Sequence, residues 1–271
     1  MLELLKKYDI HPKKNLDQHF LVDSNAIKKE IDAAGIKKNE TILEIGPGPG
    51  TLTKELIKLA KKVIVIELDK SLADLLKSEY KDTIEIINND ALKIDYPPFD
   101  KCVSNIPYSI SGKLTIKLGE IRKPAVLMYQ KEFAKRLIAK AGERDYSKIS
   151  VMTQYYFTPE YIAKVLKTSY YPAPKVDSAI VRLIPKKKNP KVKDENMFKK
   201  TVSALFCHKN QKAKKSFYHS RHMFDLSKDA SKDVAENIPL KEKKVYELTQ
   251  NEIISISNYI SAHLPQETRQ A

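Results

Sequence analysis

The sequence has no tryptophan, only two cysteines and only seven glycines among 271 residues. Cys102 and Cys207 are far apart and fit neither a metal-ligand spacing nor a disulfide framework, so we expect no metal site and a reducing cytoplasm. No run of about 18 apolar residues is present, which argues against a membrane span. The first residues lack the apolar stretch of a signal peptide, so none is expected.

Positive charge is abundant instead. The chain has 49 Lys and Arg against 34 Asp and Glu, a net charge of +15, and 42% of its residues are hydrophobic. Lys186–Arg221 alone contains 12 basic and two acidic residues. A folded core combined with concentrated positive charge indicates a polyanionic partner, most simply nucleic acid.

Strand-like and helix-like segments alternate through the first half of the chain. This alternation predicts an α/β fold with a doubly wound, mostly parallel sheet. The expected strands are 41–45, 63–67, 84–87, 101–104, 125–129, 158–166 and 179–184. The expected helices between them are 51–60, 71–80 with Ser71 as its cap, 111–119, and 132–141 closed by Gly142.

A basic, proline-containing stretch at Pro185–Lys193 predicts a domain boundary. We therefore expect one domain over residues 1–188 and a small all-helical domain over 189–271. Helices are expected at 195–208 and 251–264, the second opened by Thr249 and Glu252 at capping-box spacing. The tail 265–271 is expected to be frayed.

Three successive strand ends carry residues suited to an adenosine ligand. Gly46 begins a glycine loop between a strand and a helix, where a backbone without Cβ atoms can approach a ligand closely. Glu67 ends the next strand and could accept both ribose hydroxyls. Asp90 follows the third strand and could accept from an adenine amino group, with the Ala91 amide available to a ring nitrogen. Together they predict a nucleoside pocket without a phosphate clamp.

The fourth strand ends in the sequence Asn105-Ile-Pro-Tyr108. The Asn105 side-chain oxygen and the backbone carbonyl of Ile106 or Pro107 could accept the two N–H bonds of an adenine amino group. That contact would aim the nitrogen lone pair outwards, while Tyr108 could stack on the base. Positioning would then carry most of the catalysis of an in-line methyl transfer.

These motifs resemble the ribosomal RNA adenine dimethyltransferase family, which uses S-adenosylmethionine and has a Rossmann-like methyltransferase fold. The resemblance covers nearly the whole chain and includes the segments 17–23, 43–53, 65–69, 88–92, 105–111, 171–185 and 205–217. It implies dimethylation of two adjacent adenines in a small-subunit rRNA hairpin loop during ribosome assembly.

The resemblance also implies roles for individual residues. Matching motif positions place the methyl donor against His19, Leu21, Gly46, Glu67, Asp90 and Asn105. Tyr170 is expected to face Tyr108 across the base. The lysine-rich segment implies RNA contacts from Lys209, Lys212, Lys214 and Lys215.

Two departures from the family pattern stand out. Where the family usually has Gly-Gln-Asn-Phe-Leu, this chain has Asp17-Gln-His19-Phe-Leu. We expect the glycine turn to be lost there, and a contact through the His19 backbone to survive better than one through its side chain. The C-terminal basic motif has lysines in place of consecutive arginines, which keeps charge but loses bidentate phosphate geometry.

Three other functions share some of these features. A resistance-type enzyme acting on large-subunit rRNA would have the same pocket, and a DNA adenine methyltransferase would have a similar tetrapeptide but usually a separate target-recognition region. A non-catalytic assembly factor is disfavoured by the intact Asn105, Tyr108, Glu67 and Asp90. Nothing in the sequence requires more than a monomer.

Overall fold

The computed structural model describes residues 1–189 and 191–264, so the tail 265–271 lies outside the described residues. The chain forms two compact units, Met1–Ala134 with Phe157–Pro185, and Lys135–Tyr156 with Lys186–Ala271. The predicted domains, 1–188 and 189–271, differ from these units because residues 135–156 group with the C-terminal helices. The basic stretch at Pro185–Lys193, from which the boundary was predicted, marks only the last of the points at which the chain passes from one unit to the other.

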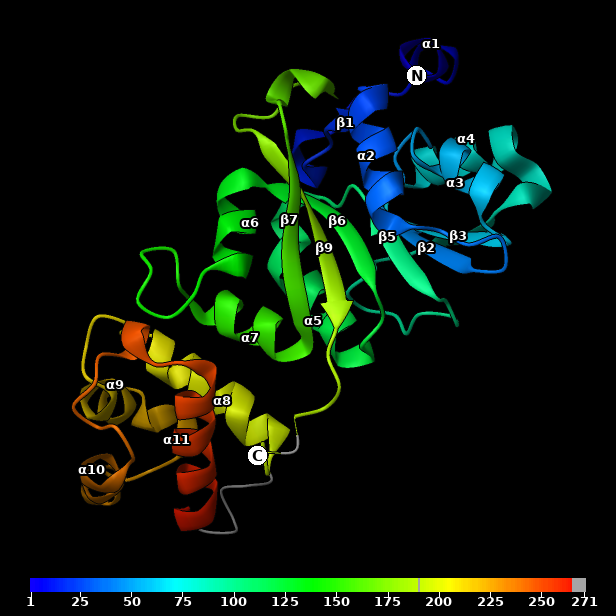
Figure 1. The fold of residues 1–271 in the computed structure, drawn as a ribbon. Coiled ribbons are helices and arrows are strands. Elements are labelled where there is room, and N and C mark those ends of the chain that lie inside the picture. Colours follow the sequence, from blue (N-terminus) through cyan, green and yellow to red (C-terminus); the bar gives the residue numbers. More distant parts are fainter. Residues whose placement is uncertain (190, 265–271) are drawn as a thin grey trace. The chain divides into compact units, whose positions relative to one another are not determined.

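The first unit is built on a seven-stranded mixed sheet in the order β4-β3-β2-β5-β6-β9-β7, flanked by helices (Figure 1). Strands β4, β3, β2, β5 and β6 are parallel, and β9 runs antiparallel between its neighbours β6 and β7. The bounds are β2 Thr41–Ile45, β3 Lys62–Glu67, β4 Glu85–Asn88, β5 Lys101–Ser104, β6 Ala125–Gln130, β7 Phe157–Val165 and β9 Ser178–Pro185. These bounds confirm the predicted strands and the doubly wound fold.

The helices of the first unit are α1 Leu2–Lys7, α2 Ser24–Ala34, α3 Thr53–Leu59, α4 Lys70–Tyr80, α5 Ser111–Ile121 and α6 Lys131–Ile138, the last of which runs on into the second unit. Four of them, α3 to α6, lie near their predicted positions, whereas α1 and α2 were not predicted. Two predicted helix ends are wrong. Asp69, not Ser71, caps α4, because its carboxylate accepts from the Ser71 amide at 3.0 Å. Gly142 lies beyond the end of α6 and donates its amide to the Tyr246 carbonyl at 2.8 Å.

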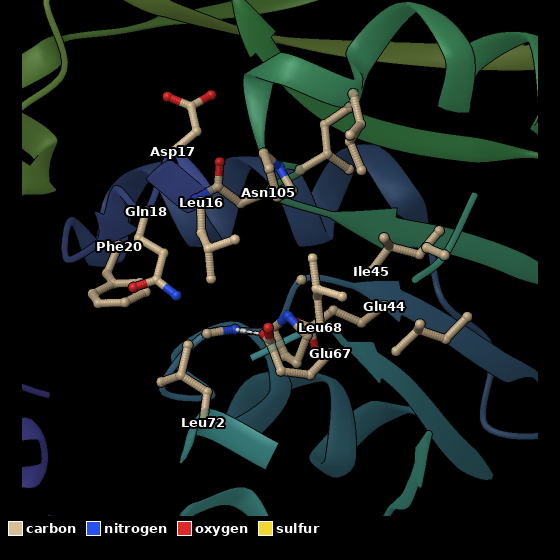
Figure 2. A pocket seen from close by; sticks show the side chains of 18 of the residues that line it. Leu16, Asp17, Gln18, Phe20, Glu44, Ile45, Glu67, Leu68, Leu72 and Asn105 are labelled. Carbon is tan, nitrogen blue, oxygen red and sulfur yellow. Dashed lines mark hydrogen bonds between the residues drawn. The ribbon is translucent and has the colours of Figure 1, made fainter. Parts of the chain in front are cut away.

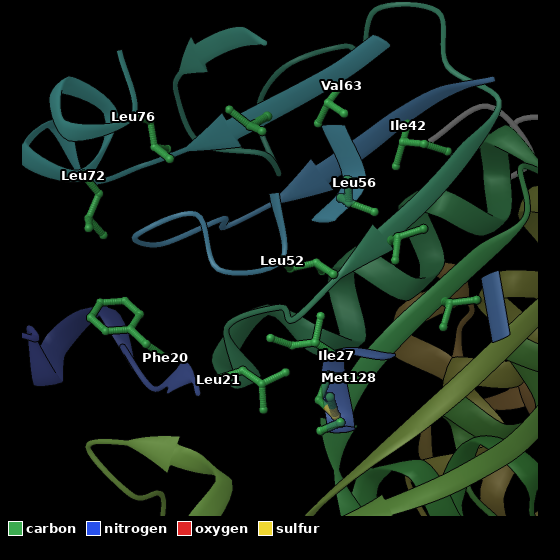
Figure 3. Close-up of a cluster of buried hydrophobic side chains, with 14 of the residues drawn as sticks. Phe20, Leu21, Ile27, Ile42, Leu52, Leu56, Val63, Leu72, Leu76 and Met128 are labelled. Atoms are coloured by element: carbon green, nitrogen blue, oxygen red, sulfur yellow. The ribbon is translucent and has the colours of Figure 1, made fainter. Parts of the chain in front are cut away.

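A short two-stranded sheet, missed in the sequence, anchors the segment before α2. Strand β1 (Phe20–Leu21) pairs antiparallel with β8 (Tyr170–Tyr171). Phe20 and Leu21 are buried in the same hydrophobic cluster as Ile27 and Met128 (Figure 3). Burial of these two side chains fixes the position of the residues just before them, Asp17–His19.

A buried carboxyl group interrupts this apolar cluster. Glu30 of α2 is fully buried, and neither of its carboxyl oxygens has a hydrogen-bond partner among the described residues. Burial, reinforced by the nearby Glu44, raises the pKa of Glu30 to about 8. The folded protein therefore keeps Glu30 protonated at a pH where the unfolded chain has released that proton. It follows that the free energy of unfolding falls as the pH rises from about 4.5 to about 8.

Replacing Glu30 with leucine should stabilise the protein. Removing a buried unsatisfied polar group is worth about 1–3 kcal/mol, which corresponds to a rise in Tm of about 2–10 °C at pH 8 for a chain of this size. The gain should shrink at pH 4, below the ordinary carboxyl pKa of 4.5, where Glu30 is mostly protonated in both states. Thermal unfolding at the two pH values measures this, with Asp32→Leu on the exposed face of α2 as the control. An equal gain at both pH values would contradict the titration of Glu30.

The second unit contains only helices as regular elements among its described residues. They are α7 Lys148–Tyr156, α8 Glu195–Phe206, α9 Ala213–His219, α10 Lys228–Asn237 and α11 Gln250–His263. The predicted capping box is confirmed, since Thr249 and Glu252 satisfy each other's backbone amides at the start of α11. The Tyr155 ring of α7 packs against Phe198 of α8 at 4.8 Å between centroids, which explains why α7 belongs to this unit. No helix in the described chain is long and apolar enough to cross a membrane.

Candidate active site

The loops after β2 and β5 meet at the switch point of the sheet. The strand order reverses between these neighbours, because β3 continues on one side of β2 and β6 on the far side of β5. Ligands of doubly wound sheets bind at such a point, outside the carboxyl ends of the strands. Gly46, with φ of +68°, shows how close the loops are, since a Cβ atom there would lie 3.0 Å from Pro107 Cδ. A side chain at position 46 would therefore both strain the backbone and displace Pro107.

A cavity of about 260 Å³ opens at this switch point. In Figure 2, Asp17, Leu16 and Asn105 lie across the cavity from Glu67 and Leu72. The predicted site residues that line it are His19, Leu21, Gly46, Glu67, Asp90, Ala91, Asn105, Pro107 and Tyr108. The fold thus gathers nine predicted residues from five separate segments at one place.

Glu67 is the acid at the end of β3, and it is 95% buried. Its two carboxylate oxygens accept from the Asp69 amide at 2.8 Å and the Gly48 amide at 3.2 Å. Burial raises the pKa of Glu67 to about 7, although these hydrogen bonds pull the pKa the other way. Each oxygen keeps a second lone pair, so the carboxylate can still accept ligand hydroxyls, and such donors would favour its ionised form.

The segment before β1 is held close to Glu67 through Asp69. Lys13 Nζ and Gln18 Nε2 each donate to an Asp69 carboxylate oxygen at 2.9 Å, and Asp69 in turn donates its amide to Glu67. The Phe20 ring lies so close to Gly48 that a Cβ atom there would be 2.9 Å from it. Neither Gln18, which lines the cavity, nor Asp69 was singled out from the sequence, although both lie in the segments 17–23 and 65–69 that carry the family resemblance.

The predicted loss of the turn at Asp17 is wrong. Asp17 adopts the left-handed conformation with φ of +54°, the region that a glycine would occupy most easily. Aspartate tolerates this region better than most residues do. Its carboxylate also accepts from the Ser109 amide at 3.0 Å, which ties the turn to the loop after β5.

Tyr108 is fixed through its hydroxyl group, which lies 2.6 Å from Ser178 Oγ at the start of β9. Burial raises the pKa of Tyr108, so the phenol is neutral. Tyr170, the predicted partner of Tyr108 across the base, is 96% buried on β8 and is not among the described residues that line the cavity. The ring of His19 stacks on that of Tyr108, at 6.3 Å between centroids, and the role of Tyr170 at the base stays a prediction.

Comparison with known proteins decides the family. The model of the ribosomal RNA adenine dimethylase family matches residues 11–260. The chain belongs to that family.

Curated members of this dimethylase family match the chain along nearly its full length. A probable ribosomal RNA small subunit methyltransferase A from Pyrococcus abyssi is 42% identical over 264 residues, covering 96% of each chain. One from Methanosphaera stadtmanae is 44% identical over 269 residues, covering 97% of this chain and 98% of the relative.

Two solved structures share the fold of this dimethylase. A dimethyladenosine transferase from Plasmodium falciparum is 31% identical with a TM-score of 0.78, covering 90% of this chain and 98% of that one. The 23S rRNA methyltransferase ErmE is 25% identical with a TM-score of 0.65, covering 89% and 99%. The Rossmann-like methyltransferase fold predicted from the sequence is confirmed.

The cofactor of this dimethylase is S-adenosylmethionine. The cavity suits the adenosine end of that molecule, because Gly46 lines it with backbone alone, which a ligand can approach closely. Glu67 offers free lone pairs for ribose hydroxyls, and Asp90 and the Ala91 backbone line the cavity beside it. No group of three or more His, Cys, Asp or Glu in the described chain is arranged to hold a metal ion.

The predicted RNA-binding lysines of the dimethylase are mostly engaged within the second unit. Lys209 donates to the Arg144 and Tyr146 carbonyls at 3.0 Å. Lys212 and Lys214 each form an ion pair of 2.7 Å with Glu242. Lys215 is exposed, and no carboxylate of the described residues lies within ion-pair distance of it. The count of charges in Lys186–Arg221 could not reveal these pairs, because Glu242 lies beyond that segment.

Proposed function

We propose that this chain transfers methyl groups from S-adenosylmethionine to the N6 atoms of two adjacent adenines in a hairpin loop of small-subunit rRNA, during ribosome assembly. The contact between the Gly46 loop and the loop that carries Asn105 supports this most directly, because transfer requires a donor bound by one loop to lie beside an amine bound by the other. The names of the full-length relatives support the small-subunit substrate.

In the proposed mechanism the residues of the loop after β5 orient the amine. The bound sulfonium supplies an electrophilic methyl group. The Asn105 side-chain oxygen and the Ile106 or Pro107 carbonyl accept the two N–H bonds of the adenine amino group. The Pro107 carbonyl already accepts from the Ile110 amide at 3.2 Å, and its second lone pair stays available. Tyr108 stacks on the base, and Glu67, Asp90 and the Ala91 amide hold the donor's adenosine.

On this proposal Leu21, Gly46 and the backbone of His19 line the donor side, and Lys209, Lys212, Lys214 and Lys215 belong to a basic RNA-binding unit. On the same proposal the protein acts as a monomer. Its ribosomal substrate is the reason to place it in the cytoplasm.

A large-subunit substrate is the second candidate, because ErmE covers most of the chain. Transfer of labelled methyl groups from S-adenosylmethionine to unmethylated small subunits, with large-subunit RNA and DNA alongside, separates the two. We expect dimethyladenine at two adjacent small-subunit loop positions, mapped by mass spectrometry. Label in large-subunit RNA alone would overturn the small-subunit assignment, and no transfer with intact subunit binding would indicate an assembly factor.

A further inference from the structure

His19 lies at the meeting point of three segments. Its ring stacks on that of Tyr108, with 6.3 Å between centroids and 27° between planes, a separation typical of aromatic rings in direct contact. His19 Nδ1 lies 2.8 Å from the Pro172 carbonyl oxygen. A carbonyl can only accept, so Nδ1 carries the hydrogen and donates it. The imidazole is therefore tied to the loop after β8 as well as to Tyr108.

The other ring nitrogen faces Asp17. His19 Nε2 lies 3.8 Å from Asp17 Oδ1, while Asp17 Oδ2 accepts from the amide of Ser109, the residue after Tyr108. Asp17 and His19 thus contact both the ring of Tyr108 and the backbone that follows it. With Ser178 on the hydroxyl group, Tyr108 is held at three points.

We propose that His19 and Asp17 are positioning residues that set the plane of the Tyr108 ring and cover one of its faces, so that the target adenine stacks on the opposite face. The inference rests on the proposed function. It also assigns the His19 side chain to the base rather than to the methyl donor. The residues usual in the family at these two positions, glycine and asparagine, have neither a carboxylate nor a ring. The arrangement therefore departs from the usual pattern of the family.

A double-mutant cycle with Tyr108 tests the inference. His19→Ala should lower kcat/KM for small subunits about 2- to 10-fold, and Tyr108→Leu about 5- to 150-fold. Because His19 acts through the Tyr108 ring, the double variant should be no slower than Tyr108→Leu alone. The affinity for S-adenosylmethionine, measured by calorimetry without RNA, should change less than twofold in His19→Ala. His19→Phe, which keeps a ring, should recover most of the lost rate.

Two results would overturn the inference. One is additive losses in the cycle, which would mean that His19 acts independently of Tyr108. The other is a tenfold loss of donor affinity in His19→Ala, which would place the side chain in the donor site. Failure of the proposed function would show differently, as absence of transfer by the unaltered protein. The affinities for S-adenosylmethionine would then still show whether the His19 side chain belongs to the donor site.

Discussion

Methyl transfer should fall by about 100-fold or more when Asn105 is replaced by alanine, while RNA binding stays nearly unchanged. The side-chain oxygen of Asn105 is the group proposed to accept an N–H bond and so to orient the amine lone pair, and losing one such preorganised contact typically costs about 10²–10³ in kcat. The RNA is expected to be held mainly by charge, which this substitution does not alter. Single-turnover transfer at saturating RNA measures the effect.

The control for this variant is its affinity for unmethylated small subunits and for S-adenosylmethionine, together with its thermal unfolding. Loss of RNA binding by Asn105→Ala, with an intact fold, would contradict its assignment to catalysis. Full transfer by the variant would show that another group of the cavity makes the contact with the amine.

RNA affinity should fall on the order of 10³–10⁵ between 50 and 200 mM salt, as expected for a protein that makes about 6–10 phosphate contacts. The net charge of +15 is the basis of this prediction. Filter binding of small-subunit RNA over that salt range measures it. A flat response would contradict the role proposed for the basic second unit.

The structure supplies a matched pair of variants for the same experiment. Lys215→Ala should reduce the salt slope by about 1, because this exposed lysine is available to a phosphate. Lys212→Ala should reduce it less, because Lys212 already pairs with Glu242 at 2.7 Å. Equal effects of the two substitutions would show that the ion pair opens when RNA binds.

The features that could be predicted from the sequence are those determined by residues close together in the chain. Strands such as Thr41–Ile45 and Lys101–Ser104 are short apolar runs, and their carboxyl ends must meet at one edge of a parallel sheet, so the glycine loop, Glu67, Asp90 and Asn105 could be placed together in advance. The capping box at Thr249 was equally local.

The features that were missed depend on partners far along the chain. Pairing of Phe20 with Tyr171 joins two-residue strands that have no periodicity to detect. The burial of Tyr170 and the stacking of His19 on Tyr108 were missed for the same reason, because they too bring together segments that are far apart in the chain. The ion pairs of Lys214 with Glu236 and Glu242 also became visible only once the helices were folded together.

The second unit is discontinuous in sequence, and this constrains how substrate choice could be exchanged between relatives. The hydroxyl groups of Tyr155 and Tyr156 in α7 both donate to Glu195 in α8, at 3.1 and 2.9 Å. A chimaera joined at residue 188 alone would combine α7 of one parent with α8 of the other and break this contact wherever the two had diverged. A chimaera that keeps the second unit intact must exchange two segments together, one that precedes β7 in the sequence and one that follows β9.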